Sequence, residues 1–256
     1  MNVLIECRGL GVVRGRRQLV EGFDFALAPG EVVGVVGPNG AGKSSLLATL
    51  AGLLPRGAGE VLLDGCSLER MPRRRIACRL GFLPQETDDP YPATVLETAL
   101  IGRHPHIGFW RWESAADVAK ARAALRRVGL AAAAARSVAT LSGGERRRLA
   151  IATLLAQAPQ VYLLDEPLET LDFAYQARLL KLLRRLARFT GIAVMMSLHD
   201  LSLAARHAHR VILLDGRGTA TAGPPDVVLG AERIAAVYGC PVRVLRVEGW
   251  PFYLVG

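Results

Sequence analysis

The sequence has no apolar run as long as the roughly 18 residues that a membrane-spanning helix needs. Its first ten residues, MNVLIECRGL, also lack the basic region and apolar stretch of a secretory signal peptide. We therefore expect a cytosolic chain without a membrane span.

Cysteine and lysine are scarce as well. The cysteines show no C-x-x-C spacing, so we expect free thiols rather than disulfides or a zinc site; they are Cys7, Cys66, Cys78 and Cys240. Only three of the 32 basic residues are lysines, and the net charge is +9. A basic surface can attract nucleic acid, anionic lipid or an acidic protein, but an arginine-rich coding bias gives the same charge. The charge alone therefore selects no function.

Apolar residues make up 51% of the chain, which excludes a disordered protein and allows one or two domains with a real core. EVVGVVG (31–37) is a continuous apolar run of the length of a buried parallel strand. An Asp-Gly turn inside 59–68 predicts a hairpin. Short strands over 3–36 and further strands alternating with helices predict an α/β fold with a parallel sheet; these later segments are strands at 79–85, 161–167, 191–200 and 210–216 and helices at 43–54 and 173–189.

The stretch 86–158 differs because helical patterns replace strands. In 116–130, for example, Val118, Ala121, Leu125 and Val128 fall on one helical stripe. We predict one catalytic core formed by 1–85 and 159–223, a helical insertion at 86–158 and a C-terminal tail at 224–256.

GPNGAGKS fits the pattern G-x-x-x-x-G-K-[ST] and follows a predicted strand. Its glycines let backbone N–H groups approach phosphate oxygens, and the start of the following helix adds partial positive charge. Lys43 is expected to contact the outer phosphates and the Ser44 hydroxyl to ligate Mg²⁺. The expected nucleoside triphosphate site consists of Gly37, Pro38, Asn39, Gly40, Ala41, Gly42, Lys43, Ser44 and Ser45.

Four further polar residues follow predicted strands, whose carboxyl ends meet at the ligand-binding edge of a parallel sheet. Asp165 would hold Mg²⁺, and Glu166 would position the attacking water. Gln85 would offer its amide oxygen to the metal or the water, and His199 would contact the γ-phosphate.

LSGGE (141–145) precedes a helical pattern and predicts a second anion site, formed by the Ser142 hydroxyl and the Gly144 N–H. One nucleotide does not need two such sites from one chain. The sequence therefore predicts a dimer in which this site closes over the nucleotide of the other subunit.

In combination, GPNGAGKS, Gln85, LSGGE, VYLLDEP and His199 resemble the ABC-type ATPase family over about residues 3–230. The resemblance implies a P-loop NTPase fold with a RecA-like mixed sheet, an N-terminal antiparallel β subdomain and an inserted helical subdomain. It implies ATP and Mg²⁺ as cofactors, with Lys43, Glu166 and His199 as catalytic residues. It also implies a head-to-tail homodimer with the signature acting in trans, through Leu141, Ser142, Gly143, Gly144 and Glu145.

The family resemblance also implies partners. The ATPase would lie peripherally on the cytoplasmic face of the inner membrane and drive permease subunits, with a substrate-binding protein as an indirect partner. The segment after Gln85 resembles the surface that contacts the membrane subunits. The stretches 94–106, 197–216 and 237–242 look like the importer branch for metal chelates: iron–siderophore, haem and vitamin B12.

The sequence departs from the family pattern in two places. Arg14 stands near the position of the aromatic residue that stacks on adenine, and a guanidinium can take that role. The loop after Glu166 reads PLETLD; Leu171 and Asp172, which communicate across the dimer, are kept.

The sequence argues against two other functions. A soluble ABC-type ATPase acting on nucleic acid or ribosomes would suit the charge. Chromosome- and repair-type members insert a long coiled coil, but only about a hundred residues separate Lys43 from Leu141. Translation-factor members carry two ATPase units, and this chain has one. A small kinase would have no use for LSGGE. We therefore expect no nucleic-acid partner. The arginine runs 73–75 and 146–148 are expected to be solvated helix faces, and the alternative is contact with lipid or with the permease.

Overall fold

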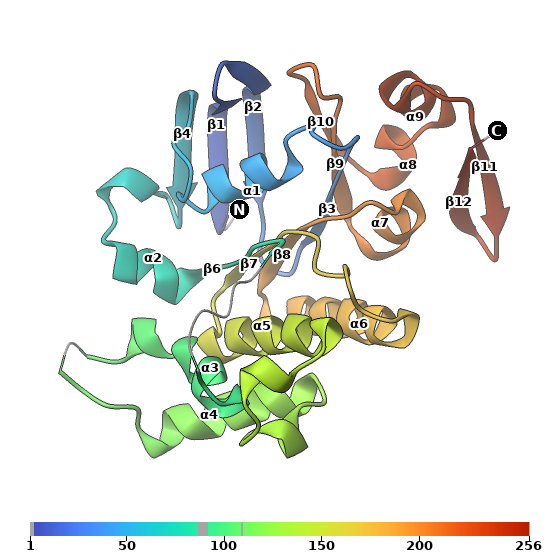
Figure 1. The fold of residues 1–256 in the computed structure, drawn as a ribbon. Coiled ribbons are helices and arrows are strands. Elements are labelled where there is room, and N and C mark those ends of the chain that lie inside the picture. Colours follow the sequence, from blue (N-terminus) through green and yellow to red (C-terminus); the bar gives the residue numbers. More distant parts are fainter. Residues whose placement is uncertain (1–2, 87–91, 109, 256) are drawn as a thin grey trace.

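The computed structural model describes residues 3–86, 92–108 and 110–255, and its strands form two large sheets and one terminal hairpin (Figure 1). The first sheet is antiparallel, in the order β2-β1-β4-β5; its strands are β1 (Ile5–Arg14), β2 (Arg17–Leu27), β4 (Ala58–Leu63) and β5 (Cys66–Ser67). The second has the order β10-β9-β3-β8-β7-β6, comprising β3 (Val32–Val36), β6 (Leu80–Leu83), β7 (Val161–Leu164), β8 (Ala193–Ser197), β9 (Arg210–Leu214) and β10 (Ala220–Gly223). All its neighbours are parallel except β9 and β10, which confirms the mixed sheet.

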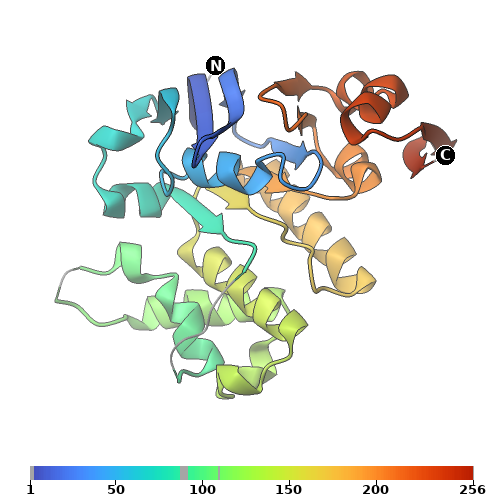
Figure 2. The ribbon, with the colours of Figure 1, turned by 45° about the horizontal axis from the view of Figure 1, so that its top comes forward.

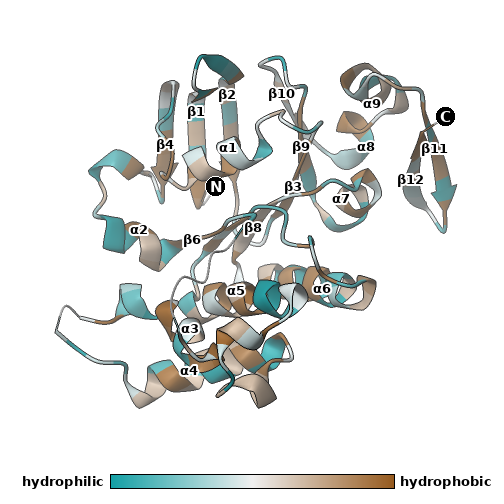
Figure 3. Ribbon diagram, in the orientation of Figure 1, coloured by the Kyte–Doolittle hydropathy of each residue, from teal (hydrophilic) through white to brown (hydrophobic). Residues whose placement is uncertain are grey.

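Strands β3, β7 and β8 are buried along their whole length, as their continuous apolar runs predict. Successive side chains point to opposite faces of a sheet, so each strand serves two cores. Val161 and Leu163 of β7 join the core beneath the antiparallel sheet, whereas Tyr162 and Leu164 join the core on the helical side. The brown strands at the centre of Figure 3 show this apolar layer. Helix α1 (Lys43–Leu50) packs in the first of these cores, against β1 and β8.

The antiparallel sheet differs from the expected short strands. β1 and β2 are ten and eleven residues long. Register shifts interrupt their pairing, but both strands continue through these bulged positions. The hairpin of β4 and β5 is confirmed. Its turn residues, Asp64 and Gly65, have φ angles of 51° and 75°, which the Asp-Gly pair adopts readily.

Three helices lie together on the side of the six-stranded sheet away from β1, β2 and β4, in both views (Figures 1 and 2). They are α3 (Val95–Ile101), α4 (Ala115–Arg127) and α5 (Gly143–Gln157), which all pack on one another. The expected stripe on α4 is confirmed: Ala121, Leu125 and Val128 are buried, and Val118 is partly buried. The division into core, helical insertion and tail stays a prediction. The segment expected to contact membrane subunits falls partly outside the described residues.

The remaining elements flank these layers. Helix α2 (Arg73–Arg79) precedes β6, α6 (Phe173–Thr190) packs on β8, and α7 (Leu201–His207) packs on β3. Short 3-10 turns are η1 (Leu68–Arg70), η2 (His104–His106), η3 (Ala131–Ala133) and η4 (Val138–Thr140). The C-terminal part forms α8 (Pro225–Val228), α9 (Ala231–Tyr238) and the hairpin β11 (Val242–Val247) and β12 (Trp250–Val255), which contacts α7. No described helix combines the length and the apolar character needed to cross a membrane.

The four cysteines are free thiols, as expected. Cys7 lies in the core of the antiparallel sheet, and burial raises the pKa of its thiol to about 12. Cys66 is exposed in the β4–β5 hairpin.

Leu163 tests the central packing because its side chain, on the central strand β7, is fully buried in the core beneath the antiparallel sheet. We expect Leu163→Ala to destabilise the protein by about 2–5 kcal/mol, through lost burial and a residual cavity. The exposed Leu53 is the matched control, and Leu53→Ala should change stability by about 0.5 kcal/mol or less. Denaturant unfolding of both variants measures the difference; equal losses would contradict this description of the core.

Candidate active site

The phosphate-binding loop connects the buried end of β3 at Val36 to the start of α1 at Lys43. Two of its glycines are required by geometry. Gly37 has a φ of 150°, and a Cβ there would come within 2.5 Å of the Leu214 carbonyl oxygen. Gly42 has a φ of 105° as the residue that caps α1, a conformation that other residues rarely adopt. These two conformations bend the loop tightly in front of the N-terminus of α1.

The Lys43 side chain is buried at the centre of this loop. Its Nζ donates to the carbonyl oxygens of Gly37, at 2.9 Å, and Pro38, at 3.3 Å. Burial lowers the pKa of Lys43, and the nearby Glu166 and Asp165 partly oppose that shift. Among the described residues no carboxylate lies within ion-pair distance of Lys43. Its ammonium is thus held in a site that an anion would complement.

The strand-end residues meet across from the loop, as the parallel sheet predicts. Asp165 and Glu166 directly follow β7, while Gln85 and His199 lie two residues beyond β6 and β8. The Gln85 Nε2 donates to Glu166 Oε2 at 3.0 Å, and His199 Nε2 lies 2.6 Å from Glu166 Oε1. The same Gln85 nitrogen also donates to Glu169, at 3.3 Å. The Glu166 carboxylate is therefore held from both sides.

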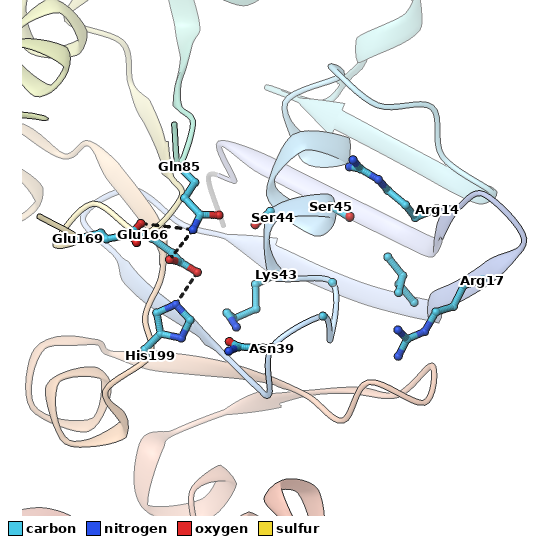
Figure 4. A pocket seen from close by; sticks show the side chains of 13 residues that line it. Arg14, Arg17, Asn39, Lys43, Ser44, Ser45, Gln85, Glu166, Glu169 and His199 are labelled. Atoms are coloured by element: carbon cyan, nitrogen blue, oxygen red, sulfur yellow. Dashed lines mark hydrogen bonds and ion pairs between the residues drawn. The ribbon is translucent and has the colours of Figure 1, made fainter. Parts of the chain in front are cut away.

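A cavity of about 600 Å³ lies between the loop and these strand ends (Figure 4). It brings together most of the predicted residues; its lining comprises Arg14, Arg17, Leu19, Asn39, Gly40, Gly42, Lys43, Ser44, Ser45, Gln85, Glu166, Glu169 and His199. Gly37, Pro38, Ala41 and Asp165 do not line it. Ala41 and Asp165 are buried behind the surface, and the carbonyl oxygens of Gly37 and Pro38 accept hydrogen bonds from Lys43.

The oxygen-rich donor set fits a hard cation such as Mg²⁺. Ser44 offers a hydroxyl, and Asp165 a carboxylate whose Oδ1 accepts from the Ser197 hydroxyl at 2.7 Å. Because the Gln85 nitrogen faces the two glutamates, its amide oxygen points toward the side of the pocket where Ser44 lies (Figure 4).

The backbone of Glu166 has an unusual conformation, with a φ of 47°. Such a left-handed conformation is uncommon for a residue other than glycine. Its N–H donates to the Ser197 hydroxyl at 2.7 Å, and its carbonyl oxygen accepts from Arg147 at 2.7 Å. Both partners are buried.

Sequence reasoning missed four residues of this region: Arg17, Glu169, Ser197 and Arg147. Glu169 could have been found, because it is an acidic residue three positions after Glu166. Arg147 belongs to the run of three arginines at 146–148, which was expected to form a solvated helix face. That expectation is wrong. Arg147 is buried, and Arg148 stacks on the Tyr175 ring at 4.1 Å. The other run, 73–75, is exposed as expected.

The signature LSGGE does not line the cavity of its own chain. It opens α5, where Ser142 caps the helix: its hydroxyl accepts from the Glu145 N–H and its own N–H donates to the Glu145 carboxylate. Leu141 is buried, whereas Ser142 and Gly143 are exposed. A Cβ on Gly144 would come within 3.1 Å of the Thr170 carbonyl oxygen, so the signature abuts the loop PLETLD.

Two residues of that loop were expected to communicate across a dimer. Leu171 is buried, and the Asp172 carboxylate caps α6 by accepting from the Tyr175 N–H at 2.9 Å. These contacts lie within one chain, and the role in a dimer stays a prediction.

Comparison with known proteins agrees with this geometry. The family model described as ABC transporter matches residues 20–169. The hemin import ATP-binding protein HmuV of Myxococcus xanthus is 45% identical, over 98% of this chain and 96% of its own length. The cobalamin import ATP-binding protein BtuD of Halobacterium salinarum is 39% identical, over 94% of this chain and 60% of its own length.

Among solved structures, an inward-facing metal-chelate-type ABC transporter superimposes with a TM-score of 0.86 and 26% identity, covering 100% of this chain and 98% of the other. The family match, the two relatives and this superposition confirm the resemblance and the fold that the motifs predicted. This chain belongs to the ABC transporter family, as one of its ATP-binding, ATP-hydrolysing subunits.

Proposed function

We propose that this chain is the ATPase subunit of a membrane importer and that Glu166 is the base that positions the attacking water. The observation that carries the proposal is the cavity in which Lys43 and Ser44 face Gln85, Glu166 and His199. A carboxylate held by two neighbours beside a phosphate-binding loop is suited to accept a proton from water.

Each side chain has a distinct task in this proposal. The buried ammonium of Lys43 leaves its two carbonyl partners and neutralises charge on the outer phosphates. Gln85 and His199 orient the Glu166 carboxylate, and His199 also senses the γ-phosphate. Ser44, Gln85 and Asp165 would hold Mg²⁺, which supplies charge stabilisation for phosphoryl transfer when bound.

The signature is proposed to act on the ATP of a second subunit. Ser142 and Gly143 are exposed at the start of α5, where a helix N-terminus attracts anions. They do not line the cavity of their own chain. A head-to-tail homodimer supplies the missing half of each site, and Leu171 and Asp172 lie in the loop next to it.

The importer assignment rests on the relatives, two of which are named for hemin and cobalamin import. We propose permease subunits as direct partners, a substrate-binding protein as an indirect partner and a peripheral position on the cytoplasmic face of the inner membrane. The proposed cargo is a metal chelate, with haem first because the 45% identical relative carries that name.

Adenine is proposed to stack on Arg14. This residue lines the cavity at the end of β1, with Arg17 beside it on the cavity wall. Arg17 donates to the Gly216 carbonyl oxygen at 2.8 Å, which leaves Arg14 as the freer guanidinium for the base.

Glu166→Gln tests the catalytic assignment. We expect the variant to bind ATP and form a stable closed dimer but to lose about 10²–10⁴-fold in turnover, because the amide cannot accept the proton. Phosphate release and nucleotide binding measure the two properties separately. In cells that lack the wild-type chain, the variant should also fail to restore hemin uptake. Wild-type turnover in this variant would overturn the assignment of the base.

Mixed subunits test the action of the signature in trans. One subunit carries Lys43→Ala and the other Ser142→Arg, so a head-to-tail dimer of the two contains one doubly altered site and one intact site. We expect retention of ATP by the mixture and by neither variant alone, measured with labelled nucleotide. A mixture that retains no more than the separate variants would contradict the dimer.

Arg14→Ala tests the stacking of adenine. The loss of one guanidinium from the base should weaken apparent ATP affinity by about 5–30-fold, if stacking contributes about 1–2 kcal/mol. Equilibrium binding of ATP and of the triphosphate moiety alone distinguishes base contact from phosphate contact. An unchanged ATP affinity would exclude the role of Arg14.

A further inference from the structure

Arg147 is a buried cation without a carboxylate partner among the described residues. Its side chain lies on α5, two residues after the signature, with only 5% of its surface exposed. Burial lowers the pKa of its guanidinium, while Glu169, Asp165 and Glu166 act in the opposite direction from a distance. A buried charge is costly unless hydrogen bonds within the protein replace those it made to water.

Those contacts are four backbone carbonyl oxygens from two different loops. Nη1 donates to Pro84 at 2.7 Å and to Gln85 at 3.0 Å, on the chain that leaves β6. Nη2 donates to Asp165 at 2.6 Å and to Glu166 at 2.7 Å, on the chain that leaves β7. The planar guanidinium therefore joins the two strand ends that carry Gln85 and Glu166.

The contact with Glu166 falls on a strained peptide. The left-handed φ of 47° persists only where surrounding contacts fix it. Ser197 fixes the N–H of Glu166, and Arg147 binds its carbonyl oxygen. With the backbone held on both sides, the Glu166 side chain reaches Gln85 and His199 at the cavity wall.

We propose that Arg147 is a positioning residue that sets the catalytic geometry of Gln85 and Glu166 from the helix that carries the signature. The reasoning rests on the proposed role of Glu166 as the base. Arg147 does not line the cavity and contacts Gln85 and Glu166 only at their backbone carbonyl oxygens, so it acts on turnover through the backbone of the two loops. Because α5 begins at the exposed signature, a displacement of that helix on engaging a second subunit would shift both loops together.

The test compares Arg147→Gln and Arg147→Lys with wild-type protein in ATP turnover. Neither side chain can bridge two pairs of carbonyls as a planar guanidinium does. We expect turnover to fall about 10–100-fold in Arg147→Gln, as for a displacement of about 1 Å, with the KM for ATP changed about twofold or less. Arg147→Lys should recover part of the rate. The matched control is Arg122→Gln on the exposed face of α4, which should keep wild-type turnover.

A double-mutant cycle separates positioning from general destabilisation. If Arg147 acts through Glu166, Arg147→Gln should lower the residual rate of Glu166→Gln by about twofold or less. Independent losses that multiply would overturn the proposal, and so would a rise in KM with unchanged turnover. If Arg147→Gln does not fold, Arg147→Lys takes its place in the cycle and should show the same non-additivity with Glu166→Gln.

The two proposals fail in different ways. Wild-type turnover in Glu166→Gln alone would refute the base and leave Arg147 without the target assigned to it. A large loss in Glu166→Gln together with wild-type turnover in Arg147→Gln would refute the positioning role alone.

Discussion

Parallel pairing of β3, β8, β7 and β6 is the interaction on which the site depends. Hydrogen bonding in this order brings the carboxyl ends of the four strands to one edge. The phosphate-binding loop follows the first of them, and His199, Glu166 and Gln85 follow the other three in turn. Residues more than a hundred positions apart in sequence thereby line one cavity. The strands can lie at the centre because both of their faces are covered by apolar cores.

Their position at one edge of the sheet does not by itself orient the side chains at the strand ends. The strained peptide of Glu166 is fixed by Ser197 from β8 and by Arg147 from α5, so its conformation depends on two elements that are distant in sequence. The Ser197 hydroxyl also donates to Asp165, which links the carboxylate proposed for Mg²⁺ to the one proposed as the base. Buried hydrogen bonds of this kind are strong in a low-dielectric interior, and they make the site rigid.

The signature shows the opposite arrangement. Its serine and glutamate satisfy each other in a capping box, and Gly144 lies next to the loop PLETLD rather than at the cavity. The N-terminus of α5 is capped and exposed, and an exposed helix N-terminus attracts anions. This separation within one chain supports the proposal that the signature acts on the ATP of a second subunit.

Much of the fold and site followed from the sequence, because their determinants are local. A buried strand needs a continuous apolar run, and the turn at Gly37 and Gly42 needs residues without a Cβ. The motifs around Lys43, Glu166 and His199 therefore identified the cavity wall. The expected lengths of β1 and β2 were wrong, because these two strands continue through bulges instead of ending at turns. Only the tertiary structure showed that Arg147 points inward from a run of three arginines, because the burial of a helical residue depends on what packs against that face.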